Sequence, residues 1–110
     1  MIDKNSFQKQ LLIYILGILD GIKKNVIDTD ESFLVLFKPN VILWLKENNF
    51  DNDLINLIDE ARELEDIKEL IPNSFNDVVD KLYCETLSQL KESSKITNTI
   101  PTSLWIIPSQ

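Results

Sequence analysis

Apolar residues recur at three- and four-residue spacing through most of this chain. In the first segment these positions are Phe7, Leu11, Leu12, Ile15, Ile18, Leu19 and Ile22. This period is that of an amphipathic α-helix and predicts a helix from Asn5 or Ser6 to Lys24. Because Ile13, Tyr14 and Leu16 occupy the remaining faces, we expect this helix to lie centrally, with neighbours on several sides. Gly17 is then the position at which another helix approaches closely.

Cap and turn residues divide the next part of the chain into short helices. Asp28, followed three residues later by Glu31, fits a capping box that opens a helix through Phe33, Leu34, Leu36 and Phe37. We expect Pro39 to end it. Asn40 is then the expected cap of a third helix, and the pair Asn48 and Asn49 its expected stop.

A fourth helix is expected to open at Asp51. Its apolar face holds Leu54, Leu57, Ile58 and Ala61. On a continuous helix Glu65 would lie within about 20° of Leu54, inside that apolar face. The sequence therefore predicts a break between Leu64 and Asp66, followed by a short helical turn that Pro72 terminates.

A last long helix is expected after Pro72, with Asn73 or Ser74 as its cap. Its core stripe is Phe75, Val78, Val79, Leu82 and Thr86. From Ser93 onward, β-branched residues and Pro101 interrupt the helical spacing. We therefore expect one helical domain over residues 1–93 and an irregular tail over residues 94–110. The apolar tip of the tail, residues 104–107, should dock on the domain, on a partner or on another copy.

The fold class follows from these elements. With only two glycines in 110 residues and abundant Leu, Ile, Lys and Glu, the chain predicts an all-α fold: a compact bundle of five to six helices with a non-helical C-terminal tail. A hydrophobic fraction of 44% supplies a core without disulfides or metal. Because Cys84 is the only cysteine and no signal peptide or membrane span is evident, we expect a cytoplasmic protein.

Negative charge is concentrated in one stretch of the chain. Residues 51–69 hold eight carboxylates and two cations, Arg62 and Lys68, and so carry six of the seven net negative charges. Such a surface repels nucleic acid and lipid headgroups and attracts basic proteins. Charged outer faces of helices also serve solubility alone, and that alternative stays open. The candidate partner-binding residues are Asp53, Asp59, Glu60, Glu63, Glu65, Asp66, Glu69 and, in the tail, Trp105.

Residues that carry catalysis or hold metals are scarce. Histidine is absent, which removes the usual general base and the commonest transition-metal ligand. Asp51 and Asp53 start like a calcium loop, but Asn56 stands where glycine is needed and Arg62 where glutamate is needed. The run from Asp28 fails in the same way. Both runs are interpreted as helix starts, and no catalytic residue, metal or cofactor is expected.

Cys84 and Trp44 are both given structural or incidental roles. Cys84 lies in the middle of a predicted helix without an activating neighbour, so we interpret it as an inert or incidentally exposed thiol. Trp44 lies among apolar residues at helical spacing and is expected to be structural.

Several short motifs carry a resemblance. They are Leu16-Gly17-Ile18-Leu19-Asp20-Gly21-Ile22, Ile27-Asp28-Thr29-Asp30-Glu31 leading to Phe37-Lys38-Pro39, and Glu63-Leu64-Glu65-Asp66. Over about Leu11 to Pro72 the chain resembles a family of short, acidic, helical bacterial proteins of unknown function. It is also similar in size and charge to immunity proteins of bacterial contact-dependent inhibition systems. That similarity implies a cognate toxin as partner and transfers no functional residues.

Three functions follow as hypotheses. The first is a non-catalytic inhibitor, such as a bacterial immunity or antitoxin-like protein, whose acidic helical surface neutralises a basic toxin domain such as a nuclease. The second is a small regulatory or scaffolding subunit that binds through its C-terminal tail. The third, an enzyme built on carboxylates with raised pKa values, has the least support in the sequence. The sequence predicts no oligomeric state.

Overall fold

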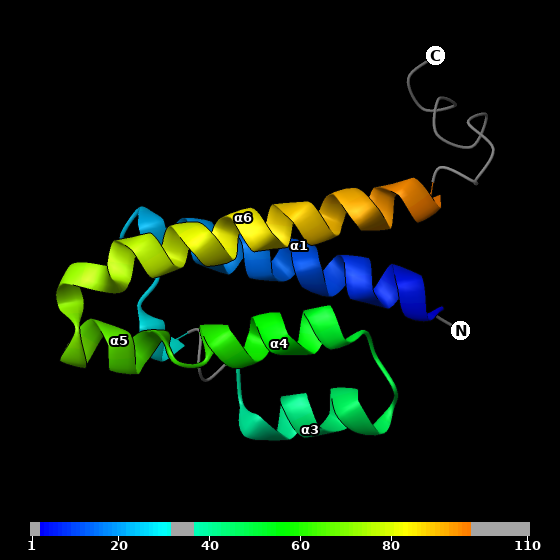
Figure 1. Cartoon of the computed structure of the whole chain (residues 1–110), viewed down its shortest axis with the longest axis horizontal. Helices are drawn as coiled ribbons and strands as arrows, with labels where there is room; N and C mark the ends of the chain where they lie inside the picture. Colours follow the sequence, from blue (N-terminus) through cyan, green and yellow to red (C-terminus); the bar gives the residue numbers. More distant parts are fainter. Residues whose placement is uncertain (1–2, 32–36, 98–110) are drawn as a thin grey trace, which may run out of the picture.

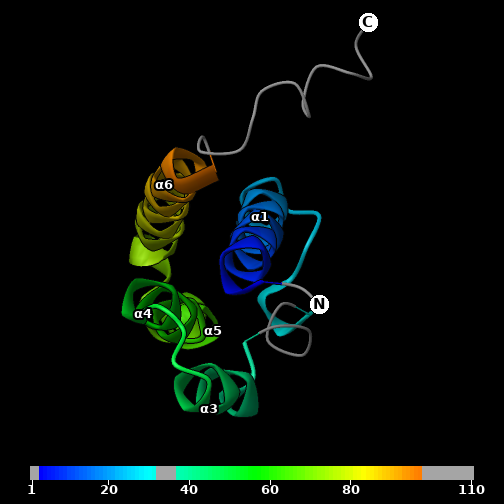
Figure 2. The same ribbon diagram turned by 90° about the vertical axis from the view of Figure 1, so that its right-hand side faces the viewer.

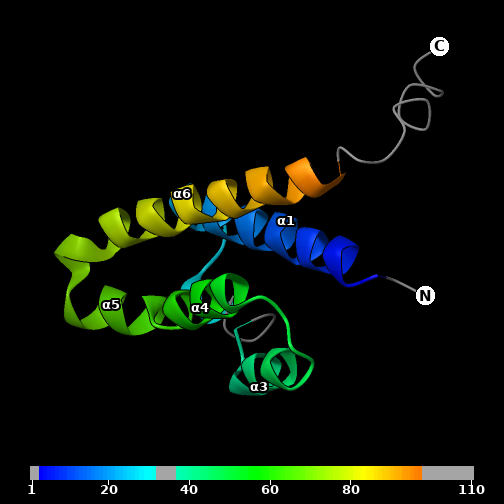
Figure 3. The same cartoon turned by 45° about the vertical axis from the view of Figure 1, so that its right-hand side comes forward.

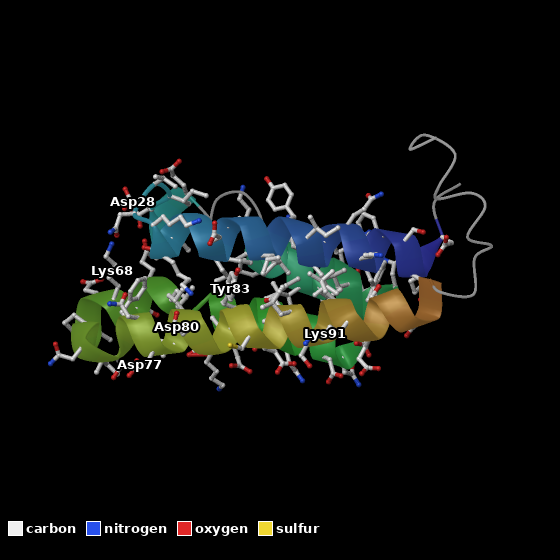
Figure 4. All side chains as sticks on the ribbon, turned by 90° about the horizontal axis from the view of Figure 1, so that it is seen from above. Asp28, Lys68, Asp77, Asp80, Tyr83 and Lys91 are labelled. Carbon is white, nitrogen blue, oxygen red and sulfur yellow. The ribbon has the colours of Figure 1, made fainter. Side chains whose placement is uncertain are left out.

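Two long antiparallel helices, α1 (Lys4–Lys23) and α6 (Pro72–Thr97), form one side of the molecule (Figure 1). The structure is a computed structural model and describes residues 3–31 and 37–97. The two helices lie side by side along most of their length, as the view from above also shows (Figure 4). The start of α1 and the end of α6 therefore lie at the same end of the bundle.

The remaining helices form the layers beneath this pair. Helix α4 (Asn52–Ala61) runs antiparallel to α6, and α5 (Leu64–Leu70) continues in nearly the same direction. Helix α3 (Pro39–Glu47) packs on α4 from the side away from α6 (Figures 2 and 3). The described residues contain these five helices and no strand, so the predicted all-α bundle is confirmed.

One apolar core joins the layers. Each helix contributes residues that are almost fully inaccessible to water, including Ile15 and Leu19 from α1, Leu54 and Ile58 from α4, and Leu82 from α6. Burying a side chain of this size stabilises the fold by about 1.5–3 kcal/mol. The predicted stripe of the last helix is confirmed: Val79, Leu82 and Thr86 are buried, while Phe75 and Val78 pack on the core half-buried. The buried Thr86 hydroxyl donates to the Leu82 carbonyl at 2.7 Å.

Helix α1 is less enclosed than the sequence predicted. Ile13 and Tyr14 are about half exposed, so the helix has an open side and does not lie centrally. Gly17 is not a point of close approach, because a Cβ there would meet nothing within 4 Å. The close approach is at Gly21 instead, where a Cβ would lie 2.4 Å from Ile27 Cδ1.

Asparagine ends both α1 and α3. Asn25 and Asn49 adopt left-handed backbone conformations, with φ of 61° and 58°. In each case the following N–H donates back to the helix, Val26 to the Gly21 carbonyl and Phe50 to the Leu45 carbonyl. These are Schellman motifs, which satisfy carbonyls that the helix end would otherwise leave unpaired. The predicted stops at Lys24 and at Asn48 and Asn49 are therefore confirmed.

Two prolines that were expected to end helices lie at the start of the next helix. Pro39 and Pro72 are the first residues of α3 and α6, where a proline loses no hydrogen bond and its fixed φ suits the helix. The predicted caps Asn40 and Asn73 or Ser74 are therefore wrong, because these residues lie inside their helices.

Two other boundaries differ from the prediction, and a third agrees with it. The break between α4 and α5 falls at residues 62–63, slightly before the expected position, and still takes Glu65 out of the apolar face of α4. Helix α6 continues to Thr97, beyond the expected start of the tail at residue 94. A helical turn begins at Thr29, directly after the expected cap Asp28. The predicted extension of this helix through Phe33, Leu34 and Leu36 lies outside the described residues.

Candidate functional site

Helix α4 carries its carboxylates on the side away from the core. Leu54, Leu57 and Ile58 are buried, and Asp53, Asp59 and Glu60 are left exposed, as helical spacing requires. Asp51 precedes the helix as predicted, but its side chain makes no capping hydrogen bond. Its backbone N–H donates to Gln8 of α1 at 2.9 Å.

Two of these carboxylates are already paired within the molecule. Asp59 lies 3.0 Å from Arg62, and Glu60 lies 3.4 Å from Lys81 of α6. Asp53 lies at the opposite end of α4, where its backbone carbonyl accepts a hydrogen bond from Gln89. Two of the three carboxylates of α4 are thus paired within the molecule, while the exposed carboxylate of Asp53 stays available to a partner.

Helix α5 and its N-cap residue, Glu63, carry the larger unpaired charge. Glu63, Asp66 and Glu69 are exposed, and within the described part of the chain none of them forms an ion pair with a lysine or arginine. Their three-residue spacing places them along one side of the helix. We call these three residues the α5 acidic surface.

A fourth carboxylate, Glu65 of α5, faces the turn that follows α1. Glu65 is half-buried, and when protonated its carboxyl group can donate a hydrogen bond to the carboxylate of Asp30. This hydrogen bond stabilises the protonated form, while partial burial and the charges of Asp30, Asp66 and Glu69 disfavour the ionised form, so the pKa of Glu65 is raised. Asp30 therefore extends the acidic surface beyond the stretch predicted from sequence.

The segment from Asp28 to Glu31 lies next to the α5 acidic surface. The Asp28 N–H donates to Glu31 Oε1 at 3.3 Å, so the predicted capping box forms this reciprocal bond. Lys68 of α5 lies 4.0 Å from the Asp28 carboxylate, and the two side chains come from separate elements (Figure 4). From sequence Asp28 and Asp30 were expected only to start a helix, because local spacing carries no signal for contacts with residues so distant in the chain.

The other predicted residues have simpler positions. Cys84 is exposed on α6. Trp105 and the rest of the apolar tip lie outside the described residues. Within residues 3–31 and 37–97, no three cysteine, aspartate or glutamate side chains are grouped so that they could hold a metal ion. No helix in the same part of the chain is long and apolar enough to cross a membrane.

Trp44 is packed and exposed at the same time. Its ring contacts those of Phe7 and Phe50 at centroid distances of 5.9 and 5.4 Å, but 47% of the residue remains accessible. The predicted structural contact is present, although Trp44 is not a core residue.

Comparison with known families now gives the chain its relatives. The model of the family described as "Protein of unknown function (DUF3969)" matches residues 2–106. The chain belongs to this family. The resemblance expected over residues 11–72 is thereby confirmed and extended to nearly the whole chain. No curated protein and no solved structure matches this DUF3969 member.

Proposed function

We propose that this protein is a non-catalytic inhibitor that binds a basic protein through the α5 acidic surface, as a bacterial immunity protein binds its cognate toxin. The supporting observation is the contrast between α4 and α5. Asp59 and Glu60 form surface ion pairs with Arg62 and Lys81, whereas Glu63, Asp66 and Glu69 have no cationic partner within the described residues and lie near Asp30 and Glu65.

The electrostatics favour binding over a purely solvating role. Carboxylates that crowd together repel one another, and after the hydrogen bond with Asp30 and partial burial, the charges of Asp30, Asp66 and Glu69 contribute to the raised pKa of Glu65. A solubility function would be served equally well by dispersed charges. Lysine or arginine side chains of a partner would relieve the repulsion and also accelerate the encounter.

Affinity capture with three forms of the full chain tests this function. The first form is intact, the second carries Glu63→Lys, Asp66→Lys and Glu69→Lys, and the third is a control. The control carries Glu47→Lys, Asp77→Lys and Glu85→Lys, which change the net charge equally at exposed positions outside α5. Circular dichroism checks that all three fold.

We expect the intact and control forms to retain the same basic protein and the α5 variant to lose it. Expression of that basic protein alone should then slow growth, and co-expression with the intact form should restore growth. Equal retention by the intact form and the α5 variant would remove the α5 acidic surface from the function.

A further inference from the structure

A cavity of about 360 Å³ opens where the segment after α1 meets the start of α6. Its apolar lining comes from Ile22, Val26 and Ile27 around the end of α1 and from Pro72 and Phe75 of α6, while polar groups make up most of its exposed lining. Such a volume lies at the lower end of the range of ligand pockets and accommodates one large side chain.

The rim of this cavity is charged. Asp28 and Glu31 line it together with Lys68. The Lys68 ammonium lies 4.0 Å from Asp28 and 5.6 Å from the centroid of the Phe75 ring, so it spans the mouth between an anion and an aromatic face. Figure 4 shows Asp28 and Lys68 facing each other from separate elements.

A second hollow continues from this rim toward α5. Asp28, Thr29 and Lys68 line both spaces, and the second adds Asp30, Glu65 and Glu69. The cavity, with its apolar side chains, therefore leads directly to the carboxylates of the proposed binding surface.

Exposed apolar side chains lie beside the cavity. Val26 is 74% accessible, and Leu70 and Ile71, which directly precede Pro72, are 76% and 55% accessible. Apolar surface of this extent is costly in water. An apolar centre bordered by charge is the usual anatomy of a protein–protein interface, in which a few buried anchors supply most of the binding energy.

We propose that this cavity receives an apolar side chain of the basic partner, flanked in the partner by lysine or arginine residues. The flanking cations pair with Asp28 and with the carboxylates of α5, and the partner's cation takes the place of Lys68 beside Asp28. Charge complementarity selects this occupant, because an acidic partner would be repelled by the rim. The proposal rests on the proposed function and adds an apolar anchor to it.

Defined peptides test the anchor separately from the charge. The probes are two blocked pentapeptides, Lys-Lys-Phe-Lys-Lys and Lys-Lys-Ala-Lys-Lys, titrated into the full-length protein while the methyl NMR signals of Val26 and Ile27 are followed. We expect the Phe peptide to shift these signals and to bind about tenfold more tightly than the Ala peptide, since only its ring leaves water on binding.

Two exposed substitutions locate the binding. Val26→Ser should remove the preference for the Phe peptide, whereas the control Ile13→Ser, on the open side of α1, should retain it. Both residues are more than half exposed, so both variants should fold. Lys68→Ala should tighten binding of both peptides, because it removes the cation that competes for Asp28.

The outcomes separate the anchor from the acidic surface. Equal binding of the two peptides, or a preference for Phe that survives Val26→Ser, would overturn the anchor while leaving charge-driven binding intact. Failure of the Phe peptide to shift the Val26 and Ile27 signals would also overturn it. Loss of partner capture by the α5 variant would still support the proposed function in any of these cases.

Discussion

Ile27 packs over Gly21 so closely that a Cβ on residue 21 would lie 2.4 Å from Ile27 Cδ1 and 2.7 Å from its Cγ1. The Gly21 carbonyl also accepts hydrogen bonds from the N–H groups of Val26 and Ile27. The end of α1 and the segment after it are thus fixed to each other. Because Ile27 and Val26 line the cavity, Gly21 also fixes the shape of the proposed anchor site.

The two glycines of α1 should respond to alanine in opposite ways. At Gly17 nothing lies within 4 Å of the added Cβ, so Gly17→Ala should stabilise the protein by about 0.5–1 kcal/mol through helix propensity. At Gly21 the same gain is offset by displacement of Ile27, with an expected net loss of about 1–3 kcal/mol. Urea unfolding of both variants measures the difference. A stabilising Gly21→Ala would show that Ile27 repacks freely.

The Schellman motifs predict a second pair of effects. Valine at position 25 or 49 should cost about 1–2 kcal/mol, because a β-branched residue is strained at positive φ. Asn25→Gly and Asn49→Gly should change stability by only a few tenths of a kcal/mol, since glycine adopts this conformation freely. Thermal unfolding of the four variants checks the prediction. Similar stability of the valine and glycine variants would contradict the assigned caps.

Much of the fold was predictable because local rules decide it. The apolar spacing of α1, the asparagine stops and the break before Glu65 all follow from residues within a few positions of one another. The errors at Pro39 and Pro72 have one cause: a proline is compatible with both the end of one helix and the first turn of the next. Only the packing of the flanking residues selects between these roles.

The candidate site was predictable in charge but not in arrangement. Helical spacing predicts that Glu63, Asp66 and Glu69 face outward, and the structure confirms it. The pairing of Glu60 with Lys81 and the approach of Asp30 to Glu65 depend on how helices pack, which local sequence does not encode. The open faces of Ile13 and Gly17 were missed for the same reason.

The aromatic cluster gives a third stability prediction. Phe7 contacts the rings of Trp44 and Phe50 at 5.9 and 5.6 Å, so Phe7→Ala should cost about 2–4 kcal/mol through lost burial and lost ring contacts. It should also shift the Trp44 fluorescence to longer wavelength. Tyr14→Ala, on the exposed side of the same helix, should cost less than about 0.5 kcal/mol. Equal losses of stability in Phe7→Ala and Tyr14→Ala would contradict a stabilising role of the Phe7 ring contacts.

Glu65 gives a prediction in pH. Its pKa is raised in the folded protein above the ordinary value of 4.5, so the ionised group destabilises the fold at neutral pH, and that penalty is relieved as the pH falls through the raised pKa. Glu65→Gln should therefore stabilise the protein at about pH 7, and the advantage should shrink at about pH 4. Unfolding in urea at both pH values measures this. If the stability gained by Glu65→Gln grew as the pH falls, the pKa of Glu65 could not be raised in the folded protein.

Asp3 should change the pH dependence of stability in the opposite direction. Hydrogen bonds from the Ser6 N–H and hydroxyl lower the pKa of Asp3 below its ordinary value of 3.8, so its contribution is present above that value and is lost as the pH falls through the lowered pKa. Asp3→Ala should destabilise the protein at neutral pH, and the loss should narrow in acid. A loss that is independent of pH would exclude the charged cap.

The central claim is that the α5 acidic surface receives a basic partner, and the rate of association tests it most directly. With the captured basic protein, stopped-flow measurements at rising salt should show fast association that slows steeply for the intact and Glu47/Asp77/Glu85 control forms. The variant with lysine at Glu63, Asp66 and Glu69 should associate at least about tenfold more slowly at low salt and depend little on salt. Equal rates and equal salt dependence for all three forms would contradict the claim.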